Sequence, residues 1–294
     1  MLEITVWDVN HGNATYIKTP NNRHIVVDLG DAEDFSPLQN LIALGVPQLD
    51  VAVITHPHRD HLDDIFNFDL IAPPTLWRPN HLSEADIRNG NRDSDMLVID
   101  EYLRISARYN APVSPGNDFK THENFGGVEF QVFVPRGCDK SNLNNHSLVV
   151  VVSYAGLKMV IPGDNESPSW KELLKDPAFV RAVKGADVFL APHHGRQAGY
   201  CPELFEVMGK PRLVIISDSA HGDTSATNYY TNQSKGWTVY DSDGASDTRY
   251  CLTTRSDGHI TVRFGWTGNG NERFLNVTTS QVNLAKVFAR TLGF

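Results

Sequence analysis

Short apolar runs separated by polar turns make up the first part of the chain. Residues 2–7 alternate between apolar and polar side chains, and 14–17 and 25–27 are two further short apolar runs. This pattern predicts a β meander. Residues 36–44 instead carry leucine and isoleucine at helical spacing ahead of a glycine, which predicts a helix. The continuously apolar run over 51–54 predicts a strand that is buried on both faces.

The second half of the chain repeats this organisation. A long helix is expected over 168–183 and a C-terminal helix over 280–291. Two β-rich segments with helices between their strands predict two sheets packed face to face, with the helices outside. The strands expected in this half lie at 128–134, 147–154, 157–161, 188–191, 213–216, 237–240, 249–254 and 259–264.

The stretch from 83 to 125 does not continue the strand pattern. It is polar and irregular, with one helix expected near 95–108, and we interpret it as an insertion over one face of the fold. We therefore expect one main domain over residues 1–266 that contains this insertion. A Gly/Asn-rich link and the C-terminal helix would then make up residues 267–294.

Charge and composition narrow the function classes. With 26 Lys and Arg against 35 Asp and Glu, the net charge is −9, which argues against wrapping nucleic acid by electrostatics alone. No apolar run approaches the roughly 18 residues of a membrane span, and the start of the chain has no secretory signal pattern. The cysteines Cys138, Cys201 and Cys251 are far apart and form no C-x-x-C pair. A cytoplasmic protein that does not act in the membrane is therefore expected.

The densest group of candidate ligands follows the apolar run over 51–54. His56, His58, Asp60 and His61 lie within six residues. In an extended chain His56 and His58 project to the same side, and the turn after them can aim Asp60 and His61 at a neighbouring point. Imidazole and carboxylate ligands suit zinc, manganese or iron. The alternative, a solvated polar loop, would require these residues to cluster without any function.

Histidines also follow the buried strands of the second half. His193 and His194 come directly after 188–191, and His221 follows the apolar run over 213–216. Polar histidine segments at the ends of buried strands in both halves predict a single shared site.

The sequence around these ligands resembles a known family. T-H-P-H-R-D-H over 55–61 resembles the T-H-x-H-x-D-H signature of the metallo-β-lactamase superfamily. D-L-G over 28–30 and I-P-G-D over 161–164 resemble that family's D-x-G turn and G-D segment. More narrowly, 7–14, 145–149 and 191–195 resemble the D-V-G-Q-G-D-A, N-x-S-L-V and V-P-H-H-G motifs of the ComEC-like branch, and 216–222 lies where that branch has a Y-G-H-P segment.

This resemblance implies a fold and a ligand set. The fold is an αββα sandwich of two mixed β-sheets flanked by helices, and the cofactors are two divalent metal ions, zinc or manganese. His56 and His58 would bind the first metal, Asp60 and His61 the second, and Asp164 would bridge them. One of His193 or His194 would complete the shell, and His221 is a further candidate for the second metal. His146 is either a first-metal ligand or a polar residue at a strand entry.

The resemblance also implies a reaction. A bridging carboxylate such as Asp164 is similar to that of the phosphodiesterase and nuclease members, so the leading hypothesis is hydrolysis of a phosphodiester, with DNA or RNA ahead of a small nucleotide. Asp60, His193 and His194 are the candidate catalytic residues, and one of the two histidines would protonate the leaving oxygen. The alternatives are a hydrolase of a small molecule (a cyclic nucleotide, lactone or thioester) and an interaction subunit that depends on a protein partner.

Three positions depart from the pattern of the branch or bear on the substrate. His11 and Asn13 stand where Gln and Asp are usual, and Arg196 replaces a common Ser and could hold a phosphate. Because the net charge is negative, binding a polyanion requires a local basic patch or a protein partner that supplies a basic surface. The arginines expected near the rim of the site are Arg59, Arg78, Arg88, Arg92 and Arg196.

Overall fold

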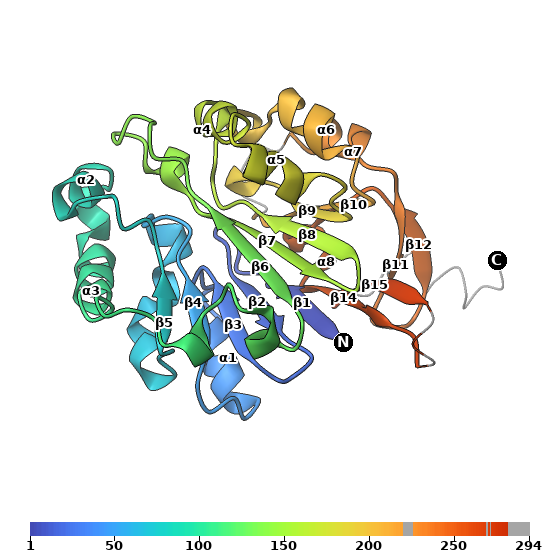
Figure 1. Ribbon diagram of the computed structural model, residues 1–294, viewed down its shortest axis with the longest axis horizontal. Helices are drawn as coiled ribbons and strands as arrows, with labels where there is room; N and C mark the ends of the chain where they lie inside the picture. The colour runs from blue at the N-terminus through green and yellow to red at the C-terminus, as the bar shows by residue number, and fades with distance from the viewer. Residues whose placement is uncertain (220–225, 269, 271, 282–294) are drawn as a thin grey trace.

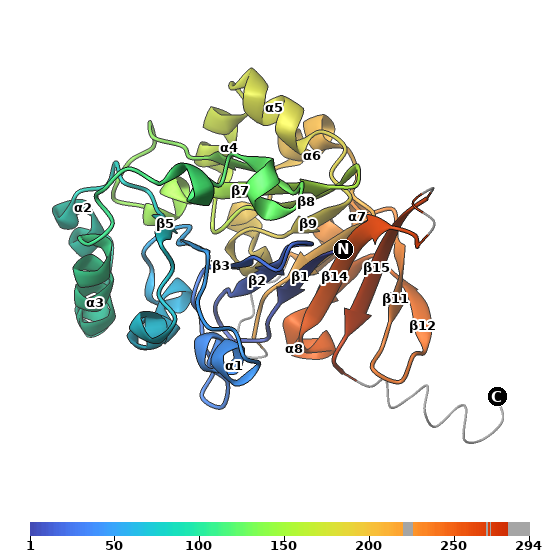
Figure 2. The same cartoon turned by 60° about the horizontal axis from the view of Figure 1, so that its bottom comes forward.

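The computed structural model describes residues 1–219, 226–268, 270 and 272–281. Two mixed β-sheets lie face to face, and helices cover their outer faces (Figures 1 and 2). This is the αββα sandwich that the sequence predicts, so the fold-class prediction is confirmed. None of the helices in the described part of the chain has the length and apolar character that crossing a membrane requires.

The larger sheet combines the N-terminal meander with strands from the C-terminal part of the chain. Strands β3, β4 and β5 run parallel to one another, as do β11 and β15, whereas β1 to β3 are antiparallel. In sheet order the strands are β12 (Ser246–Arg249), β11 (Trp237–Tyr240), β15 (Arg273–Thr279), β14 (Ile260–Trp266), β1 (Leu2–Val6), β2 (Thr15–Lys18), β3 (His24–Val27), β4 (Val51–Val53) and β5 (Thr75–Trp77).

The smaller sheet comes mainly from the second half of the chain. Strands β8, β9, β10 and β13 run parallel to one another, and β6 and β7 complete the sheet with antiparallel pairing. In sheet order the strands are β13 (Cys251–Thr253), β10 (Leu213–Ile216), β9 (Val188–Leu190), β8 (Leu157–Ile161), β7 (Val149–Tyr154) and β6 (Glu129–Phe133).

Helices pack on both outer faces. The helices α1 (Pro37–Ala43), α2 (Glu84–Asn89) and α3 (Met96–Ser106) contribute to the apolar cluster outside the larger sheet. The helices α4 (Ser167–Leu173), α5 (Pro177–Val183), α6 (Pro202–Met208) and α7 (Thr227–Asn232) contribute to the cluster outside the smaller sheet. A short helix, α8 (Thr254–Asp257), follows β13, and several single 3-10 turns lie between the strands.

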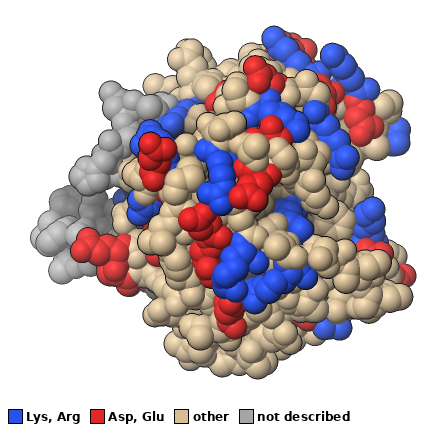
Figure 3. Space-filling model, turned by 90° about the vertical axis from the view of Figure 1, so that its left-hand side faces the viewer, with Lys and Arg blue, Asp and Glu red and all other residues tan. Residues whose placement is uncertain are grey.

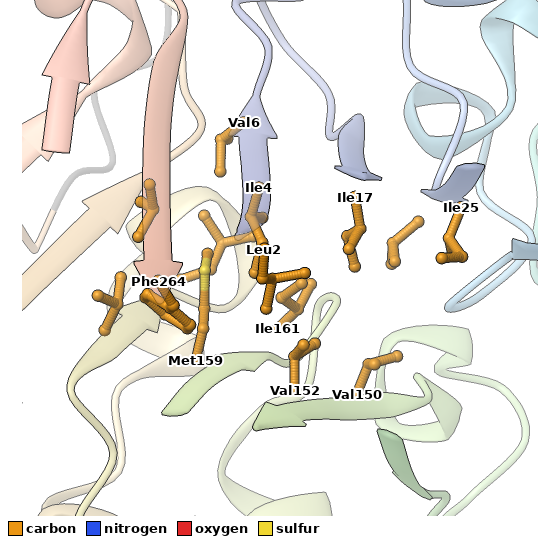
Figure 4. Packing of buried hydrophobic residues seen from close by; sticks show 14 of the residues in the cluster. Leu2, Ile4, Val6, Ile17, Ile25, Val150, Val152, Met159, Ile161 and Phe264 are labelled. Atoms are coloured by element: carbon orange, nitrogen blue, oxygen red, sulfur yellow. The ribbon is translucent and has the colours of Figure 1, made fainter. Parts of the chain in front are cut away.

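The main core lies between the sheets. Leu2 and Ile4 of β1 point toward Val150 and Val152 of β7, and Met159 of β8 packs beside them (Figure 4). The strict alternation of β1 explains this arrangement, because every second side chain of a strand faces the same side. The core is continuous and apolar, so the polar residues at the ends of the strands stand at its edge.

Two elements differ from the sequence prediction. The helix expected over 168–183 is interrupted, because Pro177 begins the separate helix α5 and Asp176 caps it through the Ala178 amide. A proline at the first helical position disfavours helical backbone at the residue before it. The strand expected over 249–254 is divided between β12 and β13, which belong to different sheets.

The segment after residue 266 contains a strand that the sequence analysis missed. Residues 273 to 279 form β15, which pairs with β14 along its whole length. Only Val277 and Thr279 of this strand are buried, so its apolar periodicity is too weak to predict a strand from sequence. The helix expected over 280–291 lies outside the described residues, apart from its first two.

Candidate active site

The candidate site lies where the carboxyl ends of parallel strands from both sheets meet. Asp28 directly follows β3, and the histidine segment over 55–61 follows β4. In the other sheet, Asp164 follows β8 and His194 follows β9. Parallel strands deliver the residues after them to the same edge of a sheet. The two edges face one cavity, which brings residues far apart in sequence together.

Four side chains converge at the floor of this cavity. One potential ligand atom from each of Asp60, His61, Asp164 and His194 lies within 4.8 Å of the others. Nε2 of His61 is 3.2 Å from Oδ1 of Asp164, and Nε2 of His194 is 3.3 Å from Oδ2 of the same carboxylate. Nε2 of His194 is also 3.2 Å from Oδ2 of Asp60. We call these four residues the floor cluster.

Contacts at Nδ1, on the side of the ring away from the cluster, fix the ring orientation of His61 and of His194. Nδ1 of His61 is 2.8 Å from Oδ2 of Asp28, and Nδ1 of His194 is 3.0 Å from the Ser217 carbonyl oxygen. Because these oxygens accept, each Nδ1 carries the hydrogen and each Nε2 points into the cluster. Both Nε2 atoms are buried and face carboxylate oxygens without forming a well-aligned hydrogen bond. Two such nitrogens beside two carboxylates fit a divalent metal ion.

His56 and His58 lie beside the floor cluster. His56 is completely buried, and its Nε2 is 4.0 Å from Oδ2 of Asp164 and 3.0 Å from Nδ1 of His58. Burial lowers the pKa of both imidazoles, which favours the neutral form that binds metal. The Asp164 carboxylate therefore adjoins three imidazoles, with His61 at Oδ1 and both His56 and His194 at Oδ2.

Asp28 is the best-anchored carboxylate near the site. Its two oxygens accept from the Thr55 amide at 2.7 Å, the Thr55 hydroxyl at 2.8 Å and the Asn13 side-chain amide at 3.0 Å, in addition to His61. Asn13 therefore supports a histidine indirectly, by fixing the carboxylate that orients it. An ionised aspartate at position 13 would have no hydrogen to donate, so this contact depends on the amide of Asn13.

Two glycines allow the ligand loop to pack against its neighbours. A Cβ atom on Gly12 would lie 2.5 Å from the Asp60 carbonyl oxygen, and one on Gly30 would lie 2.8 Å from the same atom. Both distances are shorter than van der Waals contact, so neither position has room for a side chain. The N-terminal H-G motif and the D-L-G turn thus hold the backbone of Asp60 in place.

Charges in the floor cluster compensate one another. Burial lowers the pKa of His61, but the Asp164 and Asp28 carboxylates outweigh this and raise it well above its usual value. For His194 burial is likewise outweighed by Asp164 and Asp60, and the pKa rises to about 10. Burial raises the pKa of Asp60 and Asp164, yet the neighbouring imidazoles bring both below the usual value. In the metal-free protein, protons on the imidazoles thus balance the charge of the carboxylates, and a bound metal cation would replace these protons.

Three further candidate ligands lie outside the floor cluster or outside the described residues. His193 lies beside the cluster rather than in it, with Nδ1 3.2 Å from Oε1 of Glu166. His146 is completely buried, with its Nδ1 2.9 Å from Nε2 of His81 and its Nε2 buried without a partner, so it stays a candidate ligand outside the floor cluster. His221 lies outside the described residues.

The cavity above the floor cluster has a volume of about 570 Å³. Residues from 90 to 95, within the polar stretch interpreted as an insertion, form one wall, and His11, His193 and Arg196 contribute to others. Nε2 of His11 is 3.5 Å from Oδ2 of Asp60. The polar stretch over 83–125 therefore shapes the entrance to the site.

The arginines expected near the rim divide into two groups. Arg59, Arg92 and Arg196 line the cavity. Arg78 instead donates to backbone carbonyls of the 106–109 segment, and Arg88 pairs with carboxylates of α2 and α3. On the molecular face that carries these helices, basic and acidic side chains lie side by side (Figure 3).

Two polar residues near the site were not among the sequence candidates for it. Asp28 was noted only as part of a turn motif, although its place after a strand parallel to β4 is a usable signal. Glu166 follows the G-D segment by two residues and is one of many acidic residues in the chain. Nothing in its sequence context distinguishes it, because its partner His193 is distant in the chain.

Comparison with known proteins identifies the family. The model of the metallo-β-lactamase superfamily matches residues 7–219, so the chain belongs to this superfamily of metal-dependent hydrolases. ComE operon protein 3 of Bacillus subtilis (strain 168) is 22% identical over 235 residues, which cover 73% of this chain and 28% of that protein. The chain thus spans little more than a quarter of the length of this relative.

Solved structures are similar to the chain at low sequence identity. A diphosphatase from the PhnP family is 11% identical with a TM-score of 0.47, and the match covers 90% of this chain and 98% of that one. The long form of RNase Z from yeast is 11% identical with a TM-score of 0.41, over 75% of this chain and 37% of that one.

Proposed function

We propose that this protein is a dinuclear metal-dependent hydrolase that cleaves phosphodiester bonds, with DNA or RNA as the favoured substrate. The observation that carries the proposal is the position of Asp164. Its Oδ1 faces His61, and its Oδ2 faces both His194 and His56, so one carboxylate adjoins three imidazoles. A carboxylate between two metal sites is the arrangement that the family resemblance associates with phosphodiesterases and nucleases.

The chain offers ligands for both metal positions. His56 and His58 would hold the first ion, Asp60, His61 and His194 the second, and Asp164 both. Divalent ions there would make water a stronger nucleophile near neutral pH and would stabilise charge on the phosphate oxygens. Imidazole and carboxylate ligands suit both zinc and manganese, the two metals proposed. Asp28 and the Ser217 carbonyl hold His61 and His194 in the orientation that metal binding needs.

The cavity also supports a competing function. Its volume of about 570 Å³ lies within the range of roughly 300–1,000 Å³ that is usual for small-molecule sites. The net charge of −9 opposes binding of a long polyanion. A hydrolase of a cyclic nucleotide, lactone or thioester is therefore the second candidate. A nuclease would need a protein partner with a basic surface, or the cavity-lining arginines, to offset this charge.

The location of the protein is proposed on separate grounds. Cys138, Cys201 and Cys251 are all unpaired, which is typical of a reducing compartment. We therefore keep the cytoplasm as the expected location.

An activity assay separates the candidate functions. The purified protein is stripped of metal, reloaded with zinc or manganese, and offered single-stranded DNA, duplex DNA, RNA and bis-p-nitrophenyl phosphate. Asp60→Ala serves as the inactive variant, and Asp243→Ala, in an exposed turn away from the cavity, is the matched control. Metal-dependent cleavage of polymer and reporter that is lost only in Asp60→Ala supports a nuclease.

Other results redirect the assignment. Cleavage of the reporter alone supports the small-phosphodiester enzyme. Two bound metals with no turnover on any phosphodiester contradict the proposed reaction. In that case, a protein partner that is recovered with both the wild type and Asp60→Ala supports an interaction subunit instead.

A further inference from the structure

Arg196 is an unusual cation at the wall of the cavity. Its guanidinium Nε is buried and has no hydrogen-bond partner, and within the described part of the chain Arg196 forms no ion pair with a carboxylate. Arg59, which lines the same cavity, pairs with Asp63 at 2.7 Å. A partly buried guanidinium that is not paired with a carboxylate is available to receive an anionic ligand.

A short chain of contacts holds Arg196 from behind. Nη1 of Arg196 lies 3.2 Å from Nε2 of His193, and Nδ1 of His193 lies 3.2 Å from Oε1 of Glu166. Because arginine can only donate, Nε2 of His193 accepts and its hydrogen is on Nδ1, toward Glu166. This tautomer has no proton on Nε2 to give to a leaving oxygen. His193 is therefore a positioning residue rather than the expected proton donor.

Glu166 is itself fixed at the far end of this chain. Its Oε2 accepts from the side-chain amide of Asn142 at 2.9 Å, and its Oε1 accepts from that of Asn144 at 3.0 Å. With His193 as a third neighbour, Glu166 is held on three sides and has little freedom to move.

The backbone supports the same arrangement. His193 and His194 have φ angles of 51° and 53°, and left-handed backbone is unfavourable for residues with a side chain. Such strain persists where the surroundings enforce it and is concentrated at functional sites. The turn sends His194 to the floor cluster and His193 to the wall, with their ring centroids 6.3 Å apart.

We propose that Arg196, held in place by Glu166 through His193, binds a non-bridging oxygen of the phosphate group that the floor cluster receives. This assignment rests on the proposed function and names its substrate class as phosphate esters rather than lactones or thioesters. A guanidinium offers two parallel donors to one phosphate, which a serine at this position could not provide. Arg196 is the residue of this chain that selects an anionic group.

Phosphate binding tests the proposal without relying on turnover. Inorganic phosphate is titrated calorimetrically into the metal-loaded wild type and into Arg196→Gln, Arg196→Lys and Glu166→Gln. Arg104→Gln is the matched control, because Arg104 is an arginine on α3 that pairs with Asp69 and Glu101 and does not line the cavity. Metal content and thermal unfolding are measured for every variant, so that loss of metal or of fold is recognised.

The expected result is a graded loss of affinity. Arg196→Gln should weaken phosphate binding by about tenfold or more, since a charge-assisted hydrogen bond is lost. Arg196→Lys should lose less, Glu166→Gln should lose a few-fold, and Arg104→Gln should bind as the wild type does. In the Arg196→Gln background, Glu166→Gln should cause no further loss, because a positioning residue acts only through its partner.

Several outcomes would overturn the assignment. Unchanged phosphate affinity in Arg196→Gln with normal metal content contradicts it, as does a wild type that binds no phosphate at millimolar concentration. Additive losses in the double variant contradict the positioning role of Glu166. If phosphate binding depends on Arg196 but no phosphodiester is cleaved, the proposed reaction fails and the phosphate site stands. If phosphodiesters are cleaved and Arg196→Gln leaves phosphate affinity and KM unchanged, the proposed reaction stands and the phosphate site at Arg196 fails.

Discussion

The floor and the wall of the cavity differ in burial and in how their side chains are fixed. His61, Asp164 and His194 at the floor are at most 5% exposed, and each histidine is held by a hydrogen bond from behind. Arg59 and Arg92 at the cavity entrance are exposed, and Arg59 pairs with nearby carboxylates. Arg196 lies between these two cases. It is partly buried, and its guanidinium is held by its contact with His193.

This difference separates two tasks. A metal site needs ligands fixed within a few tenths of an ångström, and buried contacts on short side chains provide that precision. Substrate selection needs charge and shape at the entrance, where long side chains can adapt. Substitutions at the floor should therefore affect metal binding and turnover together, and substitutions at the entrance should affect the substrate alone.

Asp164→Ala tests the floor most severely. Because this carboxylate adjoins the imidazoles of His56, His61 and His194, its loss should reduce kcat/KM on bis-p-nitrophenyl phosphate by more than the roughly 100-fold cost of losing a residue that only supports a ligand. Metal analysis after gel filtration should show fewer than two ions per chain. A variant that keeps both ions and full turnover would show that Asp164 is not a shared ligand.

Asp28→Asn should have the next largest effect. The substitution preserves the shape of the side chain but removes the negative charge of the carboxylate that accepts a hydrogen bond from His61. Metal affinity should therefore fall by about 10- to 100-fold. Competition with a chromogenic chelator measures this loss. Asn13→Ala, which removes one donor to the same carboxylate, should lose less. Equal losses in the two variants would contradict the central role of Asp28.

The pH dependence of metal binding tests the charges of the floor. With the pKa of His194 at about 10 in the metal-free protein, binding near pH 7 must displace a proton, so metal affinity should rise with pH by up to about tenfold per unit for each proton released. The stability of the metal-free protein, by contrast, should fall as the pH rises. Since the pKa of His194 is raised from 6.5, its stabilising contribution is complete below pH 6.5 and is lost as the pH approaches 10.

Calorimetry of zinc binding in buffers of different ionisation enthalpy counts these protons. Thermal unfolding of the metal-free protein between pH 6 and 10 checks the stability change. Zinc binding without proton release at pH 7 would show that the floor histidines are already neutral.

Arg92→Gln should have the smallest effect. This exposed side chain lines the cavity without touching the floor cluster, so metal content and turnover of bis-p-nitrophenyl phosphate should not change. If the substrate is single-stranded nucleic acid, the slope of log affinity against log salt should become shallower by about 0.7, the value of one phosphate contact. Salt titrations of binding to a labelled oligonucleotide measure it. A loss of metal in this variant would contradict the separation of floor and entrance.

The sequence predicted the architecture and the principal candidate ligands because both depend on local patterns. The alternation of β1 and the apolar run of β4 identify buried strands, and His56 to His61 follow one of them within a few residues. The two histidines at 193 and 194 were found by the same reasoning at the end of β9, whereas Asp164 was found through the resemblance of I-P-G-D to the family's G-D segment. The strand β15 escaped it, because few of its side chains are buried.

Which neighbours these residues meet was decided by the tertiary structure. Sequence could not choose between His193 and His194, because the left-handed turn that separates their rings is enforced by surrounding contacts. It could not predict that His146 pairs with His81, 65 residues away, since such pairing depends on the path of the chain between them. Short-range order follows from the chemistry of adjacent residues, whereas these contacts exist only once the two sheets have packed and brought their strand ends together.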